Sequence, residues 1–442
     1  MQGVTLAIGI LGSILVLLLR PVYALAAYIA VLVWYPDYLR VSIGTIDISA
    51  GRIVVAVLLM RCLCDNRIRG KFVWSQLDTV VALSMVVYVS IYCLAYPSLE
   101  AALENRGGFV MDTWFTYIVA RLIVTDKTTL ISFVKITTVA LAALAILGVA
   151  ESVSGKYYLL DLKRFVPWGA KRESYYVQGR WGLGRANGPF AHSIMFGACF
   201  VMFLPLVWVL RHQRDRWGKL AYPLSGIAIL GAFSSMSSGP WGMLLVVLVC
   251  LVLEKYKRWT KPLLIAVIGS CIVVGIISNR PFYHVLYNYM DFTGGSWWQR
   301  ARLVDLATED FGQWWLTGYG GQDPGWGQKT GESHTDCNNE FILAGMEYGL
   351  LGIIALCSVL AAAFRALVRA FRETTDKELQ SVYWSLGSSL VGVIAVWQGV
   401  SFFGQMPALF YSILGIISAS SCFPRCAQSC SPNHGLTNTT LC

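Results

Sequence analysis

The sequence predicts an all-α polytopic membrane protein with about 11–13 transmembrane helices and a large, partly helical outer loop. Hydrophobic residues make up 56% of the 442-residue chain, and charged residues only 14%. A soluble domain carries roughly 25% charged residues, and a disordered chain has a low hydrophobic content. The composition therefore excludes both a water-soluble globular protein and a disordered one.

The apolar residues also gather into stretches long enough to cross a bilayer. A helix needs about 20 mainly apolar residues to cross the hydrocarbon core, with a range of about 17–25. Scanning on this criterion gives thirteen candidates, several of them short: 5–19, 22–36, 52–64, 77–96, 109–124, 130–151, 190–210, 220–236, 241–254, 262–279, 341–364, 381–403 and 408–422. The first stretch has no basic residues before it, so we expect no cleavable signal peptide.

The net charge of +10 is unevenly distributed among the connections. One set of connections holds nineteen basic and eight acidic residues, whereas the opposite side holds fourteen basic and seventeen acidic ones. Cytoplasmic loops carry the excess of Lys and Arg, so the first set is predicted to face the cytoplasm. The charge then reports orientation, and no nucleic-acid partner is expected.

Two predicted outer connections are much longer than the others. The expected organisation is an N-terminal transmembrane bundle, a first outer basic segment, central transmembrane helices, a large outer catalytic loop, C-terminal transmembrane helices and a cytoplasmic tail, at 1–151, 152–189, 190–279, 280–340, 341–422 and 423–442. Connections longer than about 12–15 residues are usually functional or disordered, and these two are rich in Trp, Tyr and Gly. We therefore expect the chemistry on the outer side.

The first outer segment is strongly basic. Two acidic residues, Asp161 and Glu173, face seven basic ones: Lys156, Lys163, Arg164, Lys171, Arg172, Arg180 and Arg185. Such an excess favours an anionic ligand, and the planar guanidinium group binds phosphate through two hydrogen bonds. Arg180 and Arg185, among glycines and close to a predicted span, are the preferred candidates. Contact with lipid headgroups and carbonyl oxygens is the structural alternative.

The second outer segment combines a predicted helix with a polar entrance to the next span. Residues 296–311 suit an amphipathic helix, on which Trp298, Arg302, Asp305 and Glu309 have helical spacing. After a turn-rich stretch, His334 precedes Asp336, Asn338 and Asn339 at the entrance of the span from 341. Histidine suits proton transfer near neutral pH, although a lone loop histidine is often incidental.

The cysteines and acidic residues indicate neither disulfides nor a metal centre outside the membrane. Cys337 is alone in its outer segment, so an outer disulfide framework is not expected. The outer segments contain no Asp-x-Asp pair or other obvious metal-ligand spacing. Cys422, Cys426 and Cys430 are four residues apart, which leaves lipidation, metal binding or an unpaired reduced set open.

Three segments, in this order, resemble the O-antigen ligase/polymerase superfamily. RANGPFAH at 185–192 resembles its Arg-x-x-Gly-x-Phe element. Arg302-Leu303, followed by LTGYG at 316–320, resembles its Arg-Leu…Pro-Leu-x-Gly-x-Gly loop. The stretch 339–352 resembles its His-Asn-x-Tyr-Leu…Glu-x-Gly-Leu-x-Gly entry to the next helix. The resemblance covers roughly 175–360.

The resemblance implies a C-type glycosyltransferase-like enzyme of the bacterial cytoplasmic membrane. Such enzymes transfer a glycan from undecaprenyl diphosphate, on the outer side, to a lipid-A core or other acceptor, or to another lipid-linked repeat. It implies a metal-independent, inverting reaction without a cofactor, in which arginines hold the diphosphate and a loop histidine activates the acceptor hydroxyl. The residues carried over are His334, Arg302 and Arg185 as catalytic, and Arg180, Arg300, Asp336, Asn338, Asn339 and Trp298 as substrate-binding.

Two departures from the family pattern bear on these roles. The family histidine directly precedes the asparagine, where this chain has Asn338, so His334 and Asp336 both stay candidates for the base. The family's Ser-Arg-Gly turn corresponds to 237–239, which contains no arginine. More of the diphosphate binding then falls on Arg180, Arg185, Arg300 and Arg302.

Two other functional classes compete with this interpretation. A transporter or flippase of anionic lipid-linked saccharides predicts ionisable residues along a path and discontinuous helices in paired halves. The predicted spans are poor in charge, with Asp112, Arg121, Lys135 and Glu347 as the main exceptions, and no repeated halves are evident. A structural subunit of a glycan-assembly complex is the third interpretation.

Overall fold

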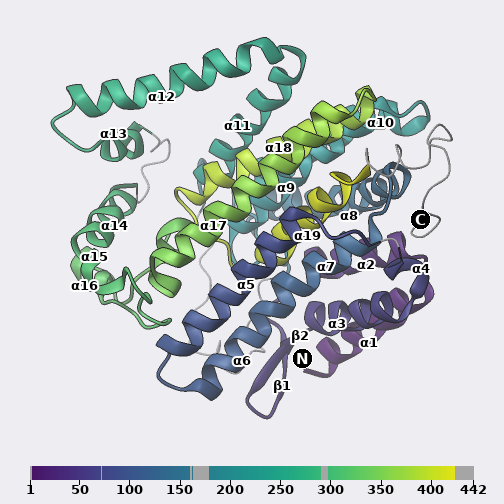
Figure 1. The fold of residues 1–442 in the computed structure, drawn as a ribbon, viewed down its shortest axis with the longest axis horizontal. Coiled ribbons are helices and arrows are strands. Elements are labelled where there is room, and N and C mark those ends of the chain that lie inside the picture. The colour runs from purple at the N-terminus through teal and green to yellow at the C-terminus, as the bar shows by residue number, and fades with distance from the viewer. Residues whose placement is uncertain (1, 71, 160–161, 163–178, 290–296, 424–442) are drawn as a thin grey trace, which may run out of the picture.

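The computed structural model describes all residues except 1, 71, 160–161, 163–178, 290–296 and 424–442, and is mainly helical (Figure 1). The first part contains α1 (Gln2–Leu18), α2 (Pro21–Trp34), α3 (Ala50–Cys64), α4 (Asn66–Arg69), α5 (Gln76–Ala95), α6 (Leu99–Val110), the π-helical turn η1 (Met111–Phe115), α7 (Thr116–Ile123) and α8 (Lys127–Ser154). Between α2 and α3, β1 (Arg40–Ile43) and β2 (Ile46–Ser49) form an antiparallel hairpin.

The second part begins with the helices that surround the centre of the molecule. These are α9 (Ser193–Val209), the short 3-10 turn η4 (Leu210–His212), α10 (Arg216–Ser234), α11 (Ser238–Lys255), the 3-10 turn η5 (Lys257–Trp259) and α12 (Thr260–Ile277). Four short helices follow, α13 (Phe282–Tyr289), α14 (Trp297–Glu309), α15 (Phe311–Trp314) and α16 (Trp326–Thr330). The chain ends in α17 (Glu340–Glu373), α18 (Lys377–Trp397) and α19 (Met406–Ser420).

The helices confirm an all-α polytopic membrane protein. Within the described residues, seven helices are long and apolar enough to cross a membrane: α5, α8, α9 with η4, α11, α12 with η5, α17 and α18. Three more, α1, α2 and α19, are apolar but shorter. Each of the thirteen predicted stretches overlaps a helix. The total of 11–13 spans stays a prediction.

The centre of the molecule is α9, which packs against α10, α11 and α18. Almost all of α9 is buried, as its uniformly apolar sequence predicts. Gly197 on α9 permits a close approach, because a Cβ there would lie 2.5 Å from the Ser235 hydroxyl oxygen. The turn between α10 and α11 therefore sits directly against α9. In contrast, α12 has no buried residue and lies apart from the bundle (Figure 1).

A break in α17 is the point where residues 315–319 contact the membrane helices. At Gly349 the backbone has φ 67° and ψ −164°, which interrupts the helix. The Tyr319 amide donates to the Met346 carbonyl over 2.6 Å, and the Leu350 amide donates to the Trp315 carbonyl over 2.8 Å. Irregular backbone in a membrane helix must have its polar groups satisfied within the protein, which these bonds achieve. Two of the motif segments, 316–320 and 347–352, are thereby packed together.

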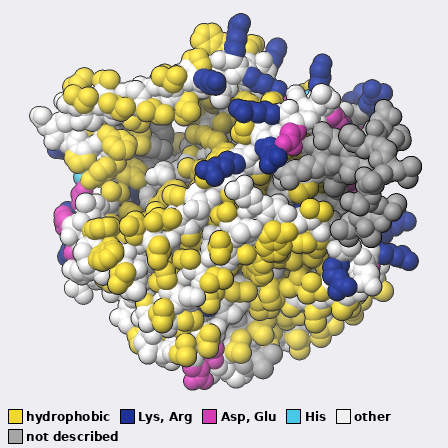
Figure 2. Space-filling view, in the orientation of Figure 1, with side chains coloured by type: hydrophobic (Ala, Val, Ile, Leu, Met, Phe, Trp, Pro, Cys, Tyr) yellow, Lys and Arg dark blue, Asp and Glu magenta, His cyan; other side chains and the backbone are white. Residues whose placement is uncertain are grey.

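Charged side chains are distributed unevenly over the surface. Figure 2 shows hydrophobic side chains across the middle of the molecule, with Lys and Arg side chains mainly along its upper and right edges. The Lys257 ammonium lies 4.5 Å from the centre of the Phe371 ring, which places the connection between α11 and α12 beside the C-terminal end of α17. The site residues described next lie at the N-terminal ends of α9, α11 and α17, away from this basic end.

Candidate functional site

The segment 179–192, which leads from α8 into α9, is anchored by a buried carboxylate. Glu151, near the end of α8, accepts hydrogen bonds from the backbone amides of Asn187 (3.0 Å) and Gly188 (2.8 Å). A carboxylate that accepts several backbone amides is well satisfied even when buried. Glu151 therefore holds the backbone that carries Arg185.

Two arginines from this segment reach the turn between α10 and α11. The Arg185 guanidinium donates to the Ser237 hydroxyl over 2.9 Å, and Arg180 donates to the Met236 carbonyl over 3.2 Å. The Ser237 hydroxyl also lies 3.2 Å from the hydroxyl of Ser193. Ser237 precedes the first residue of α11, and Ser193 is the first residue of α9. We call Arg180, Arg185, Ser193 and Ser237 the arginine site.

The electrostatics of the arginine site favour an anion. Burial lowers the pKa of Arg185, and the like charge of Arg180 lowers it further, to about 10. Helix N-termini carry partial positive charge, and the N-termini of α9 and α11 meet here. Two guanidinium groups and two helix N-termini together suit a ligand with more than one negative charge, such as a diphosphate.

The backbone at the arginine site is strained. Among the described residues, Trp181 (φ 54°) and Met236 (φ 45°) are the two non-glycine residues with positive φ. Trp181 follows Arg180, and the carbonyl of Met236 accepts the Arg180 hydrogen bond. Trp181 is also exposed and stacks on Trp241, with ring centres 5.5 Å apart. Such strain tends to occur at functional sites, where the surrounding structure maintains it.

A second group of predicted residues lies at the N-terminus of α17. The Tyr287 hydroxyl (2.6 Å) and the Asn339 amide (3.3 Å) both donate to the Gln398 carbonyl. Asn339 also caps α17, because its side-chain oxygen accepts the amide of Phe341 at 3.0 Å. Burial raises the pKa of Tyr287, while Asn339 and the nearby charge of Arg300 oppose this effect. Asn339 thus supports the structure here, and its predicted role in substrate binding stays a prediction.

Three of the predicted substrate-binding residues line one small cleft. Arg300, Asp336 and Asn338 surround it, and its volume of about 20 Å³ suits a single water molecule. Within it the Asn338 amide donates to the Asp336 carboxylate over 3.1 Å. His334 is exposed and does not line this cleft; its Nδ1 lies 3.2 Å from the Ser333 hydroxyl.

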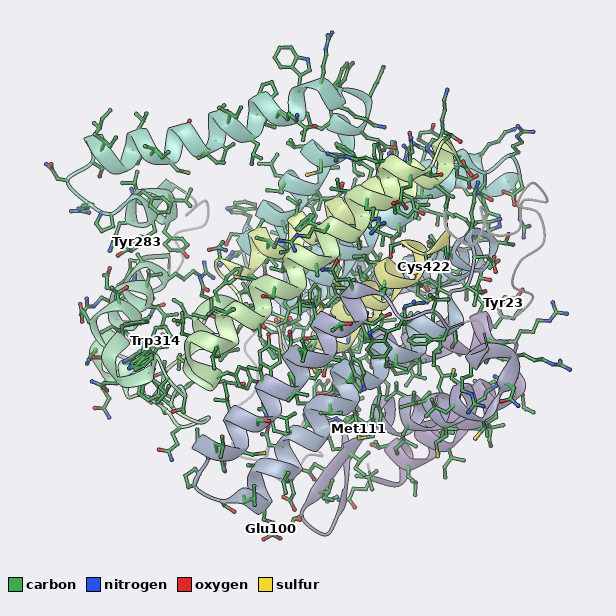
Figure 3. All side chains as sticks on the ribbon, viewed as in Figure 1. Tyr23, Glu100, Met111, Tyr283, Trp314 and Cys422 are labelled. Atoms are coloured by element: carbon green, nitrogen blue, oxygen red, sulfur yellow. The ribbon has the colours of Figure 1, made fainter. Side chains whose placement is uncertain are left out.

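Arg302 and Trp298 are both on α14 and both reach the surface. Arg302 forms ion pairs with Glu309 (2.8 Å) and Asp305 (3.6 Å) on its own helix, as the predicted spacing requires. Trp298 is 61% exposed, so its indole ring is accessible to a ligand. The buried Trp314, labelled in Figure 3, instead donates to the Ala307 carbonyl over 2.8 Å and holds the short helices together.

Sequence reasoning missed one histidine in this region. His284, on α13, places its Nε2 atom 3.0 Å from a carboxylate oxygen of Asp305 on α14. The same oxygen accepts the hydroxyl of Tyr283 at 2.7 Å. We call His284, Asp305, Tyr283 and Arg302 the His284 cluster. The available signal was that His284 is one of only five histidines and lies in the segment 280–340.

A single loop, 398–405, contacts both groups of residues. On one side Phe403 packs against His192, which caps α9, with ring centres 6.4 Å apart. On the other side the carbonyl of Gln398 accepts the bonds from Tyr287 and Asn339. The arginine site and the helices α13 and α17 are thus connected through this one loop.

Some predicted features lie outside the described residues. These are Asp161, Lys163, Arg164, Lys171, Arg172 and Glu173 in the first outer segment, and Cys426 and Cys430 in the tail. In the part of the chain that is described, no three His, Cys, Asp or Glu residues are placed to hold a metal ion. No protein-family model matches this chain, and no curated protein sequence matches it.

Proposed function

We propose that this protein is a membrane glycosyltransferase of the O-antigen ligase or polysaccharide polymerase type. In this proposal it transfers a glycan from undecaprenyl diphosphate to a hydroxyl of an acceptor glycan or glycolipid, on the outer side of the bacterial cytoplasmic membrane. The observation that carries the proposal is the arginine site. Arg180 and Arg185 meet where the N-termini of α9 and α11 come together.

The reaction needs an electropositive site of this kind. When the bond between the sugar and the diphosphate breaks, negative charge develops on the leaving oxygen. Hydrogen-bond donors already in place stabilise such charge, and each is typically worth about 2.7–4 kcal/mol. Arg185 is partly buried and fixed by Ser237, so it needs little rearrangement to act in this way.

The acceptor is a sugar hydroxyl, which needs a general base. The resemblance points to His334 or Asp336 for this role. Asp336 shares its cleft with Arg300 and Asn338, whereas His334 is exposed beside it. An exposed histidine on a loop is accessible to an incoming acceptor, and the Asp336 carboxylate is held by the Asn338 amide over 3.1 Å.

Transport of anionic lipid-linked saccharides is the second candidate, favoured by the interruption of α17 at Gly349. Two observations weigh against it. The backbone groups at the break are satisfied, because the Leu350 amide donates to the Trp315 carbonyl and the Met346 carbonyl accepts from the Tyr319 amide. The charged residues among the helices pair with each other, as in Arg52–Asp112 (2.7 Å) and Arg121–Asp78 (3.2 Å).

Glycan transfer by the purified protein in detergent tests the proposal, because transport requires two compartments and transfer does not. The protein is incubated with an undecaprenyl-diphosphate-linked oligosaccharide and candidate acceptors, and the products are sized. A ladder indicates polymerisation, and a single larger product indicates ligation. Arg185→Ala should abolish transfer, whereas Arg67→Ala, an exposed arginine on α4, should not. No product with any acceptor, together with donor movement across vesicles, would contradict the proposal.

A further inference from the structure

The His284 cluster joins two helices through a shared carboxylate. Nε2 of His284 lies 3.0 and 3.1 Å from the two oxygens of Asp305, which also accepts the Tyr283 hydroxyl. A carboxylate on one ring nitrogen fixes the proton on that nitrogen and leaves the other as an acceptor. Among the described residues no hydrogen bond reaches Nδ1 of His284. The ring is therefore oriented, with one basic nitrogen available.

The surroundings of His284 favour proton transfer. Arg302 lies 3.6 Å from Asp305 and 2.8 Å from Glu309, so the carboxylate of Asp305 is balanced by positive charge. Burial raises the pKa of Asp305, but the bonds from His284 and Tyr283 and the charge of Arg302 bring it below its usual value. Burial and the bond to Asp305 raise the pKa of Tyr283 to about 12.

The remaining neighbours of His284 carry little charge. The helix α12 packs on α13, and its only charged residue is Lys261 near its start; Arg280 is the one charged residue in the connection between the two helices. The side chain of His284 is 30% exposed, so a ligand has access to the ring. The imidazole of His284 is thus partly exposed, whereas the Asp305 side chain that orients it is only 20% exposed.

The cluster is also anchored to the loop that borders the arginine site. Tyr287, one turn after Tyr283 on α13, donates to the carbonyl of Gln398. Five residues later in the same loop, Phe403 packs on His192 at the start of α9. The helix that carries His284 and the helix whose N-terminus faces Arg185 are therefore held by one short segment.

We propose that His284 accepts the proton of the acceptor hydroxyl in glycan transfer, with Asp305 as its positioning residue; this rests on the proposed function. Nδ1 takes the proton as the hydroxyl oxygen bonds to the anomeric carbon of the donor sugar. The bond from that carbon to the diphosphate oxygen breaks, and the diphosphate leaves with the electron pair. Asp305 stabilises the imidazolium ion, which later releases its proton to water.

His334, the histidine that the resemblance favours, lacks this arrangement. In the described part of the chain, its ring has a hydrogen bond to Ser333 and none to a carboxylate. The two histidines therefore provide a direct comparison. Both lie outside the membrane-spanning helices and both are accessible, but only His284 has a carboxylate that orients it.

The test measures kcat and KM of glycan transfer for the wild type and for His284→Gln, Asp305→Asn and His334→Gln. His284→Gln should lose about 10²- to 10⁴-fold in kcat, the usual contribution of a general base. Its KM should change little, and the donor should still protect this variant against proteolysis. Asp305→Asn should lower kcat and leave KM within about twofold, because the carboxylate acts on the orientation of the imidazole and not on substrate binding. His334→Gln is the comparison and should lose less activity than His284→Gln.

Different results would overturn different claims. If the wild type transfers glycan and His284→Gln is within about twofold of it, the role of His284 is wrong and the proposed function stands. If His334→Gln loses activity and His284→Gln does not, the role of His284 is also wrong and the proposed function stands. If His284→Gln does not fold, Asp305→Asn decides: an unchanged kcat rejects the role. Thr308→Ala, an exposed position on α14 whose hydroxyl donates to the Val304 carbonyl of the same helix, is the control and should stay within about twofold of wild type. If the wild type transfers nothing, the proposed function fails first.

Discussion

Arg121 on α7 donates to Asp78 on α5 over 3.2 Å, with both side chains buried inside the bundle. Asp78 also accepts the hydroxyls of Tyr117 (2.5 Å) and Ser418 (2.7 Å). Three helices, α5, α7 and α19, thus meet at one carboxylate. This carboxylate is fully satisfied only while Arg121 is present.

Removal of the Arg121 charge should therefore destabilise the protein strongly. Arg121→Met leaves Asp78 buried without its cation, which typically costs about 3–5 kcal/mol. The free energy of unfolding, measured by denaturant titration in detergent, checks this. Lys127→Met is the control, since its partners Asp376 and Glu378 are more exposed and such pairs are worth about 0–1 kcal/mol. Equal losses in the two variants would contradict the expectation.

Glu151 should affect catalysis without contacting a substrate. Glu151→Ala leaves the amides of Asn187 and Gly188 without acceptors, which costs about 1–3 kcal/mol of stability. It also releases the segment that positions Arg185, so transfer should fall at least about tenfold. Glu151→Gln keeps one acceptor oxygen and should lose less. Glu373→Ala is the control; Glu373 is the last residue of α17, and this variant should retain full transfer.

The charge of Arg185 should produce an alkaline limit to activity. With a pKa of about 10, Arg185 loses its proton as the pH rises through that value, and the site then binds an anion less well. At low donor concentration, kcat/KM should fall above about pH 10. Arg180→Ala removes the like charge that lowers this pKa, so the fall should move to higher pH. A fall that stays in place, or moves to lower pH, would contradict the assignment.

Glycine should be required at the break in α17. Gly349 has a positive φ, and a Cβ there would lie 2.5 Å from the Leu316 carbonyl oxygen. Gly349→Ala should therefore cost about 1–3 kcal/mol and loosen the segment 315–319. Thermal unfolding in detergent and protease sensitivity of this segment measure the two effects. Gly312→Ala is the matched control, because nothing lies within 4 Å of a Cβ at that position.

The helices could be predicted from the sequence because a membrane leaves few choices for an apolar stretch. A segment such as 190–210 has no water to satisfy its backbone, so it must be helical, and α9 occupies it. Two segments that the sequence relates only through the family resemblance, 316–320 and 347–352, are in contact in the structure. The charge spacing of Arg302, Asp305 and Glu309 also appears as predicted.

The parts that could not be predicted depend on single contacts between distant residues. His284 and Asp305 are on different helices, so no periodic pattern relates them. Glu151 lies at the end of an apolar stretch, where its sequence context gives no sign of the amides that it accepts. Likewise the left-handed conformations of Trp181 and Met236 arise from packing around Arg180 and have no signature in residue type.

The interruption of α17 also bears on biosynthesis. Residues 315–319 precede α17 in the chain, so the ribosome completes them before the helix that they contact. The backbone groups of 315–319 that form hydrogen bonds across the break at Gly349 are therefore synthesised before α17 enters the bilayer. We therefore expect insertion of α17 to be coupled to the folding of residues 315–319. We expect these residues to assist the assembly of the membrane helix that follows them in the chain.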